Sequence, residues 1–250
     1  YIGNSLINPT IILDNMPGSS DHNSGRLLIG PTIEPGLTGE TASHTQFRLY
    51  YTIGDMGAGQ FTNTNRTENA QNVNVLEGKT LRLNSEIDGD GGLDAWIPND
   101  NPFYNASTIS PRDYVYTLGH RNPQGLVWGF AKSSPDTKIL YSNEQMDKTD
   151  DEVNILEPSK NYGWDKVSGY CDNNVNGYKI GRTVSADEAA FCNVPANNHQ
   201  EPIFTLFTVD ALGMAALYAQ SNNALWPTIA CSSIEFYGKN VIPGWPNSLL

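Results

Sequence analysis

A histidine in a turn-rich loop is the first residue of this sequence that could do chemistry. His22 lies within the segment Pro17–Arg26, directly before an apolar run that predicts a strand. The pKa of an imidazole lies near neutrality, so a histidine held on a rigid β scaffold is suited to act as a general base. The alternative is a structural histidine that caps the loop, and the residue types alone favour that plainer interpretation.

A second polar loop combines a guanidinium with two amides. The string Gly119–Gly125 places Arg121, Asn122 and Gln124 in a glycine-bounded turn between two predicted strands. Arginine presents a planar fork of donors, whereas asparagine and glutamine both donate and accept hydrogen bonds. The loop is either a polar rim that binds a ligand or an ordinary hydrogen-bonded turn.

Two acidic segments are candidate cation sites. Asp88–Asp94 carries hard carboxylates at alternate positions, as calcium loops do, but it lacks the later bidentate glutamate of an EF-hand. A solvated Asp-Gly turn is the commoner outcome for such a segment. Asp150–Glu152 follows the polar run Asn143–Gln145, and it could help to hold a cation or form a solvated acidic face.

An indole and a hydroxyl lie close together near the end of the chain, at Trp226 and Thr228. A tryptophan face is a stacking platform for an aromatic cofactor. A tryptophan packed in the core is the default alternative.

Short strand-like runs dominate the chain and would position these loops. The predicted strands are Arg26–Gly30, Phe47–Gly54, Thr80–Leu83, Tyr114–Leu118, Leu126–Phe130, Lys138–Ser142, Ile203–Thr208 and Ile234–Tyr237. They are rich in aromatic or aliphatic residues and are bounded by Gly, Pro, Asn or Asp. Asp210–Gln220 is the best helical candidate. The predicted fold class is therefore all-β.

Two pairs of these runs share a layout. In each pair the second apolar strand leads into a polar loop at the same end: Leu49–Ile53 leads into Gly54-Asp55, and Ile139–Ser142 leads into Asn143–Gln145. Such repetition is how a propeller blade places side chains near its axis, although a β-sandwich fits the same pattern.

The charge balance excludes some partners. The chain has 250 residues, enough for one or two domains, with 15 basic and 27 acidic residues and a net charge of −12. This sign repels phosphate backbones and anionic membranes, so we expect no nucleic-acid partner. No apolar run approaches the roughly 18 residues that would span a bilayer, so we expect no membrane insertion. Tyr1–Thr10 lacks the basic start and the apolar stretch of a signal peptide.

Three cysteines bear on the redox environment. Cys171 and Cys192 flank a polar stretch, and a disulfide between them would close a long loop, where a crosslink is most effective in the chain-entropy model. Cys231 is then left over. Three buried thiols are the alternative.

Eight motifs of the chain, taken in order, form a recognisable set. They are Asp21–Arg26, Tyr50–Asp55, Leu81–Asn84, Ile97–Phe103, Tyr116–Leu126, Asp151–Asn154, Asn161–Trp164 and Trp226–Thr228. The set resembles that of the soluble, pyrroloquinoline quinone (PQQ)-dependent glucose dehydrogenases, within the wider group of glucose/sorbosone dehydrogenases. The resemblance covers nearly the whole chain and implies a six-bladed β-propeller.

The resemblance also implies an activity, which is oxidation of an aldose at the anomeric carbon with hydride transfer to PQQ. His22 matches the general base, Asp55 the carboxylate that orients it, and Arg121 the group that faces the reacting quinone oxygen. The residues that match cofactor contacts or line the site are Asn122, Gln124, Trp226 and Thr228.

The family's calcium lies against the cofactor and acts as a Lewis acid. Where the family has Gln-Gly-Pro supplying backbone carbonyls, this chain has Gln145-Met146-Asp147. These three residues and Asp151 are the predicted calcium region. Asn223 replaces an aromatic residue of the family, and insertions at Thr32–Arg48 and Glu86–Trp96 lengthen two loops.

The length predicts one partial propeller domain over residues 1–250. Six bare blades need roughly 240–270 residues, and the loops of this family add to that. We therefore expect blades at both ends of the propeller to lie outside this sequence, with a cofactor-contacting lysine and later arginines among them.

The resemblance implies a secreted or periplasmic sugar dehydrogenase with a sugar substrate and an external electron acceptor, and it leaves a homodimer open. The first alternative is a non-catalytic propeller of the same family that binds carbohydrate or protein. A structural or adhesive domain of a larger extracellular protein is the second. The retained His22 and Arg121 favour the enzyme.

Overall fold

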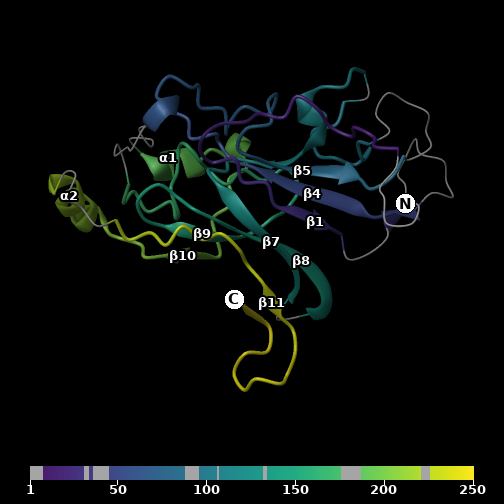
Figure 1. Ribbon diagram of the computed structural model, residues 1–250. Coiled ribbons are helices and arrows are strands. Elements are labelled where there is room, and N and C mark those ends of the chain that lie inside the picture. The colour runs from purple at the N-terminus through teal and green to yellow at the C-terminus, as the bar shows by residue number, and fades with distance from the viewer. Residues whose placement is uncertain are drawn as a thin grey trace.

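Two four-stranded antiparallel sheets form the centre of the computed structural model (Figure 1), which describes residues 8–30, 34–35, 45–87, 96–105, 107–131, 134–175, 187–220 and 226–250. The first sheet has the order β1-β4-β5-β6. Its strands are β1 (Leu27–Ile29), β4 (Arg48–Ile53), β5 (Lys79–Asn84) and β6 (Val115–Leu118). Each strand is antiparallel to its neighbour in the sheet, so the end of one strand and the start of the next lie at the same end of the sheet.

The second sheet has the order β10-β9-β8-β7. Its strands are β7 (Pro123–Ala131), β8 (Ser134–Glu144), β9 (Asp151–Ile155) and β10 (Phe204–Leu206). The long β7–β8 hairpin has a register shift between Pro123 and Gly125, beside the polar loop that precedes β7. Such an irregularity redirects side chains at a strand end.

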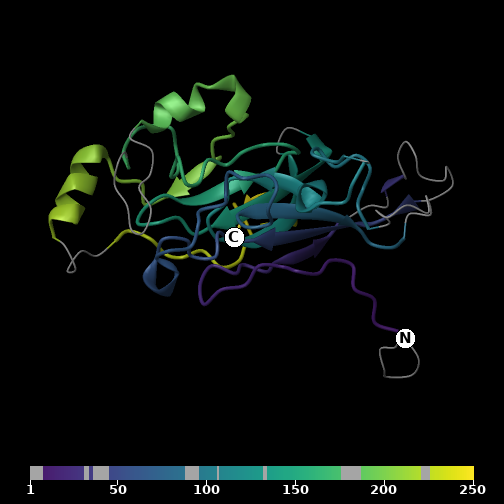
Figure 2. The same ribbon diagram turned by 90° about the horizontal axis from the view of Figure 1, so that it is seen from above.

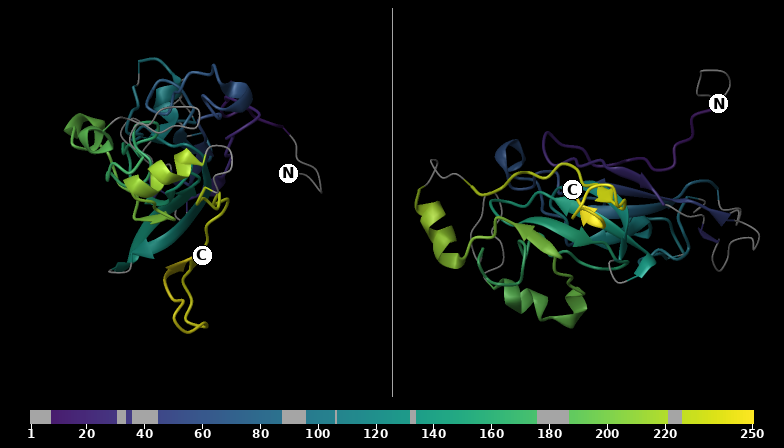
Figure 3. Two further views of the ribbon diagram at one scale, coloured as in Figure 1. Left: turned by 90° about the vertical axis from the view of Figure 1, so that its left-hand side faces the viewer. Right: turned by 90° about the horizontal axis from the view of Figure 1, so that it is seen from below.

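Smaller elements surround the two sheets. They are the pairs β2 (Glu34–Pro35) with β3 (Thr45–Gln46) and β11 (Phe236–Tyr237) with β12 (Ser248–Leu249), the helices α1 (Glu188–Cys192) and α2 (Ala211–Ala219), and the 3-10 turns η1 (Phe61–Asn63), η2 (Pro111–Tyr114) and η3 (Pro195–Asn197). Both α-helices lie beyond one end of the sheets (Figure 2), and the β11–β12 pair extends away from them (Figure 3). In the described ranges no helix has the length and apolar character needed to cross a membrane.

A buried aromatic and aliphatic cluster joins the two sheets. Tyr50 packs edge-on against Tyr116 of its own sheet, with ring centroids 5.3 Å apart. It also packs edge-on against Trp128 of the second sheet, at 5.5 Å between centroids. Leu126 and Leu140 of the second sheet complete the cluster. The sheets therefore hold each other in place through a shared core, and their loops are fixed with them.

The sheets agree with the mostly-β prediction. Each has the strand number of one propeller blade, and a closed six-bladed propeller stays a prediction. Each predicted strand range contains or overlaps a strand of the structure, and α2 occupies the predicted helical segment with Asp210 as its N-cap. Asp88–Asp94 and most of the two predicted insertions lie outside the described residues.

One interpretation of the acidic segments is wrong. Asp151 and Glu152 begin β9, and Asp150–Glu152 are at most 1% exposed, so they do not form a solvated acidic face. The acidic composition hides the strand from a pattern based on apolar residues, since these carboxylates are accommodated by buried donors and not by water.

Candidate active site

The antiparallel pairing of β1 with β4 brings His22 and Asp55 together. His22 precedes β1 and Asp55 follows β4, so both lie at the same end of this strand pair. His22 Nδ1 lies 2.6 Å from Asp55 Oδ1, and the two residues are 8% and 1% exposed. Because Nδ1 faces the Asp55 carboxylate, Nε2 is the ring nitrogen directed away from Asp55.

Close backbone packing fixes this pair. A Cβ on Gly54 would lie 2.1 Å from the carbonyl oxygen of His22, so only glycine allows the two loops to approach this closely. Asp55 also accepts hydrogen bonds from the backbone N–H of Gly57 and from Trp164 Nε1, each at 2.8 Å. The carboxylate is therefore held by three donors, and the imidazole is oriented by a fixed partner.

Trp164 joins the histidine pair to Arg121. Its indole N–H binds Asp55, while the Arg121 guanidinium carbon lies 5.4 Å from its ring centroid. A backbone hydrogen bond of 2.8 Å from Asp55 N to Arg121 O ties the same two loops. The structure thus brings together His22, Asp55 and Arg121, the three predicted catalytic residues.

The Arg121 side chain is buried against the loop after β8. Its Nη1 donates to the backbone oxygens of Gln145 at 3.2 Å and Met146 at 2.6 Å, and its Nη2 lies 3.4 Å from Asp147 Oδ1. Its Nε is buried without a hydrogen-bond partner among the described residues. A buried donor of this kind is available to a ligand acceptor.

Two of the predicted cofactor contacts, Asn122 and Gln124, lie in the loop before β7 and at its start. Asn122 accepts a hydrogen bond from Ser24 Oγ at 3.0 Å and donates to Gln145 Oε1 at 3.3 Å, so it connects the histidine loop with the loop after β8. Gln124 lines an adjoining cavity of about 330 Å³ with Arg26. The remaining residues of that cavity are Ser24, Gly25, Leu27 and Ser232.

Thr228 and Asp151 meet in an anchor for the chain that follows Trp226. The Asp151 carboxylate accepts from Thr228 Oγ1 at 2.8 Å, Ile229 N at 2.8 Å, Ala230 N at 2.9 Å and Met146 N at 3.0 Å. Four donors around one carboxylate leave little lone-pair capacity for a metal. Asp151 therefore serves to position the segment 228–230 and the loop after β8.

The predicted calcium region does not fit a divalent cation in this arrangement. The Gln145 and Met146 carbonyls and the Asp147 carboxylate all contact the Arg121 guanidinium. Calcium binds oxygen at about 2.3–2.6 Å, so an ion on the Met146 carbonyl would lie within roughly 5 Å of that guanidinium. At an effective dielectric constant of about 20 the repulsion is about 7 kcal/mol.

Sequence reasoning missed Lys148. Its Nζ lies 4.0 Å from the Trp226 ring centroid and 5.0 Å from that of Tyr218, whose ring packs edge-on against Trp226. Burial lowers the pKa of Lys148, with nearby Arg121 acting in the same direction and Asp147 opposing both. The only sequence signal was a lone cation between acidic residues in the loop after β8.

Glu144 was also missed, and it supports Arg121 from behind. Its carboxylate accepts a backbone hydrogen bond from Arg121 N and contacts His120 Nδ1, both at 2.9 Å. Burial raises the pKa of neighbouring Glu152 well above its usual range, and Glu144 adds to this shift. Glu144 and Glu152 are each 1% exposed, so they support the loop that carries Arg121 from inside the protein.

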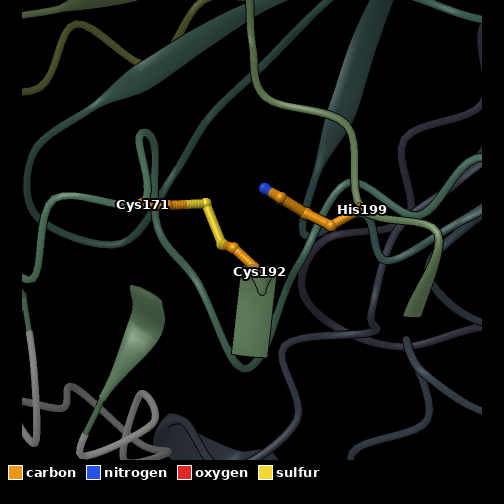
Figure 4. A group of neighbouring side chains, drawn as sticks. All are labelled: Cys171, Cys192 and His199. Carbon is orange, nitrogen blue, oxygen red and sulfur yellow. A yellow bond between two sulfur atoms is a disulfide. The ribbon is translucent and has the colours of Figure 1, made fainter. Parts of the chain in front are cut away.

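Cys171 and Cys192 form a disulfide with a Cα–Cα distance of 6.4 Å, and Cys231 is free. Figure 4 shows the His199 side chain directed toward this disulfide. The disulfide fastens α1 to the segment that follows β9, away from the histidine pair.

The largest described cavity, of about 580 Å³, lies at the other ends of the strands. It is lined by Tyr50, Trp128, Lys138 and Glu157 among others, and it contains none of the predicted site residues. Its size therefore does not identify the site, whereas the convergent polar groups at the opposite strand ends do.

Comparison with known proteins gives a consistent result. The model of the glucose/sorbosone dehydrogenase family matches residues 3–198. Over 280 aligned residues, the chain is 34% identical to quinoprotein glucose dehydrogenase B of Acinetobacter calcoaceticus, covering 98% of this chain and 52% of that protein. It is also 34% identical over 116 residues to aldose sugar dehydrogenase YliI of Escherichia coli strain K12, covering 46% of this chain and 27% of that protein.

Among solved structures, the chain is similar to the soluble aldose sugar dehydrogenase of Escherichia coli in its apo-form. The TM-score is 0.50 at 23% identity, and 99% of this chain and 71% of that chain are covered, a likeness of fold. The chain spans about half the length of the first of these curated relatives and a smaller share of the second.

Proposed function

Because the chain belongs to the glucose/sorbosone dehydrogenase family, we propose that it is part of a quinoprotein that oxidises an aldose at its anomeric carbon to the lactone. The relative that aligns with 98% of this chain is named a quinoprotein glucose dehydrogenase. This name supports PQQ as the hydride acceptor. The sugar itself and the external electron acceptor are not specified by these residues.

The observation that carries the proposal is the buried connection from His22 through Asp55 and Trp164 to Arg121. A base and a cation are held on one rigid frame, with the indole of Trp164 hydrogen-bonded to Asp55 and its ring against the guanidinium. Removal of a proton together with a hydride needs this pairing of functions at adjacent positions.

His22 performs the proton step in this proposal. Its Nε2 takes the proton of the anomeric hydroxyl, while Nδ1–H stays on Asp55. The imidazolium that forms is stabilised by the Asp55 carboxylate, which is 2.6 Å away and almost fully buried. The anomeric hydrogen leaves with both electrons of its C–H bond, so loss of one proton and one hydride gives the lactone.

Arg121 supplies positive charge at the hydride acceptor. PQQ, when bound, is the group that accepts the hydride. The partnerless Nε of Arg121 suits a ligand rich in oxygen acceptors. The guanidinium would stabilise negative charge on an acceptor oxygen, with its orientation fixed by the loop after β8. No step of the proposal depends on calcium.

A secreted or periplasmic location is part of the proposal. Structural disulfides persist in oxidising compartments, and the chain has one between Cys171 and Cys192.

The experiment is a titration of the chain with PQQ, followed by addition of aldoses, with the absorbance of the bound quinone as the readout. We expect saturable binding and bleaching by at least one aldose. His22→Gln should keep PQQ binding and lose bleaching by a factor of about 10²–10⁴, the usual contribution of a general base.

His199→Gln is the matched control, since His199 lies beside the disulfide and outside the site. Equal loss of bleaching in both variants would refute the role of His22. The same titration is made on a form extended to the full length of its relatives. Absence of PQQ binding by both forms would refute the quinoprotein proposal and favour a recognition role for the same scaffold, whereas binding by the extended form alone would show that further segments complete the site.

A further inference from the structure

We propose that Lys148 is a second anion-binding group of the site, and that Lys148 and Arg121 together receive the carboxylates of the cofactor in place of a divalent cation. This inference rests on the proposed function, since it takes PQQ, a planar polycarboxylate, as the ligand.

Among the described residues, the direct contacts of the Lys148 ammonium are aromatic rings and not carboxylates. The residue is 8% exposed, and no carboxylate of the described residues lies within ion-pair distance of its Nζ. Its contacts are the rings of Trp226 and Tyr218, at 4.0 and 5.0 Å from the ring centroids. Ring faces offset only part of the desolvation of a charge, so an anion is the partner that would complete this environment.

Lys148 and Arg121 form one positively charged surface. Arg121 is fastened to the backbone of the loop after β8, and Lys148 is part of that same loop. Each cation is backed by an indole, Trp164 for Arg121 and Trp226 for Lys148. Of the described carboxylates, Asp147 is the one that contacts the Arg121 guanidinium, so a planar anion would bind between the two cations while its rings contact Trp226.

The same arrangement removes the need for a bound metal. The oxygens that a divalent ion would use are those of Gln145, Met146 and Asp147, and all three contact the guanidinium. The positive charge at this position is therefore already provided by the side chains of the protein. In the structural alternative, Lys148 binds no ligand and only packs the loop after β8 against the Trp226 ring.

Tryptophan fluorescence separates the two roles, since Trp164 and Trp226 border the site. The chain is titrated with PQQ in the presence of a calcium chelator and again with added calcium, and then with the methyl ester of PQQ. We compare Lys148→Gln with the unmodified chain. Lys138→Gln is the matched control, because it removes the same charge from an exposed position on β8, away from the loop that contains Lys148.

We expect the Kd for PQQ to agree within about twofold with and without calcium. Lys148→Gln should raise it by about tenfold or more, the usual effect of one charge-assisted hydrogen bond, and Lys138→Gln by less than about twofold. Lys148→Arg should restore binding. The ester should bind the chain and Lys148→Gln equally, since it offers no carboxylates.

If Lys148 has only a structural role, the result differs. Lys148→Gln would then lower the melting temperature and weaken the binding of PQQ and of its methyl ester alike. That outcome, or calcium-dependent binding by the unmodified chain, would overturn the inference while leaving the proposed function intact. If neither the chain nor a form extended to the full length of its relatives binds PQQ under either condition, the proposed function fails as well.

Discussion

Gly54 has the clearest steric role of any single residue in the site. It lets the backbone of β4 pass the carbonyl of His22, and the carboxylate of the next residue then reaches the imidazole. The neighbour that a Cβ would meet is backbone, which cannot rotate away as a side chain can. The geometry of the His22–Asp55 pair therefore depends on glycine at position 54, where any Cβ would meet the His22 backbone.

Gly54→Ala should separate His22 from Asp55. A Cβ placed 2.1 Å from the His22 oxygen forces the loops apart, so we expect a loss of about 1–3 kcal/mol in unfolding free energy, the usual cost of overpacking. Aldose-dependent bleaching of the quinone should fall at least tenfold. Chemical denaturation and the bleaching assay measure the two effects.

Gly18→Ala is the control, because a Cβ added at Gly18 would meet no atom within 4 Å and the residue lies in the same loop region as His22. If Gly54→Ala were as stable and as active as Gly18→Ala, the close approach of the two loops at Gly54 would be wrong.

At the scale of elements, β9 shows where sequence patterns succeed and fail. Runs rich in aromatic or aliphatic residues and bounded by turn formers located the other main strands, because these side chains pack in the cores of the two sheets. β9 begins with Asp151 and Glu152, and their burial depends on donors from distant segments such as Thr228 and Gly169. No local pattern contains that information.

The candidate site divides in the same way. His22, Asp55 and Arg121 follow from motifs in the sequence, because each lies in a loop directly attached to a strand. Lys148 and its ring contacts could not be predicted, since α2 and the segment at Trp226 are brought to the loop after β8 only by the tertiary fold.

The disulfide joins α1 to the segment after β9, and its contribution to stability can be tested separately. Cys171 and Cys192 are 21 residues apart, and the chain-entropy model gives about 3 kcal/mol for a loop of that length. A Cys171→Ser/Cys192→Ser double variant should lose about that much unfolding free energy. Denaturation curves in the absence of reductant measure the loss.

The bleaching activity of this double variant should be retained under conditions where it is folded, because the disulfide contacts none of the proposed catalytic residues. Cys231→Ser serves as the control for cysteine replacement. A loss of bleaching without a loss of stability would instead connect α1 with the site.

At the scale of the whole molecule, buried acids make stability depend on pH. Burial raises the pKa of Glu68 to about 8, with the charge of Asp55 adding to the shift, and it raises the pKa of Glu188 to about 7. Between pH 4.5 and these values the folded chain keeps protons that the unfolded chain has lost. Stability must therefore fall as pH rises through that window.

Lys79 acts in the opposite sense at higher pH. Burial lowers its pKa to about 7, so above that value the unfolded chain binds the proton that the folded chain has released. Stability then rises with pH until the ordinary pKa of lysine is passed. The two effects together predict a minimum of stability at about pH 7–8, between the ranges in which the carboxyls and Lys79 dominate.

Glu68→Gln isolates the larger of the carboxyl contributions. Glutamine keeps the shape and neutrality of the protonated acid, and it cannot ionise in the unfolded chain. Its unfolding free energy should therefore match that of the original chain near pH 3 and exceed it near pH 7. The slope between these values should differ by as much as about 1.4 kcal/mol per pH unit, the limit for one proton.

Glu157→Gln, at an exposed position, should leave the slope unchanged. Parallel slopes for Glu68→Gln and the original chain would show that Glu68 ionises in the folded state. A second negative charge would then lie close to Asp55 in the folded chain.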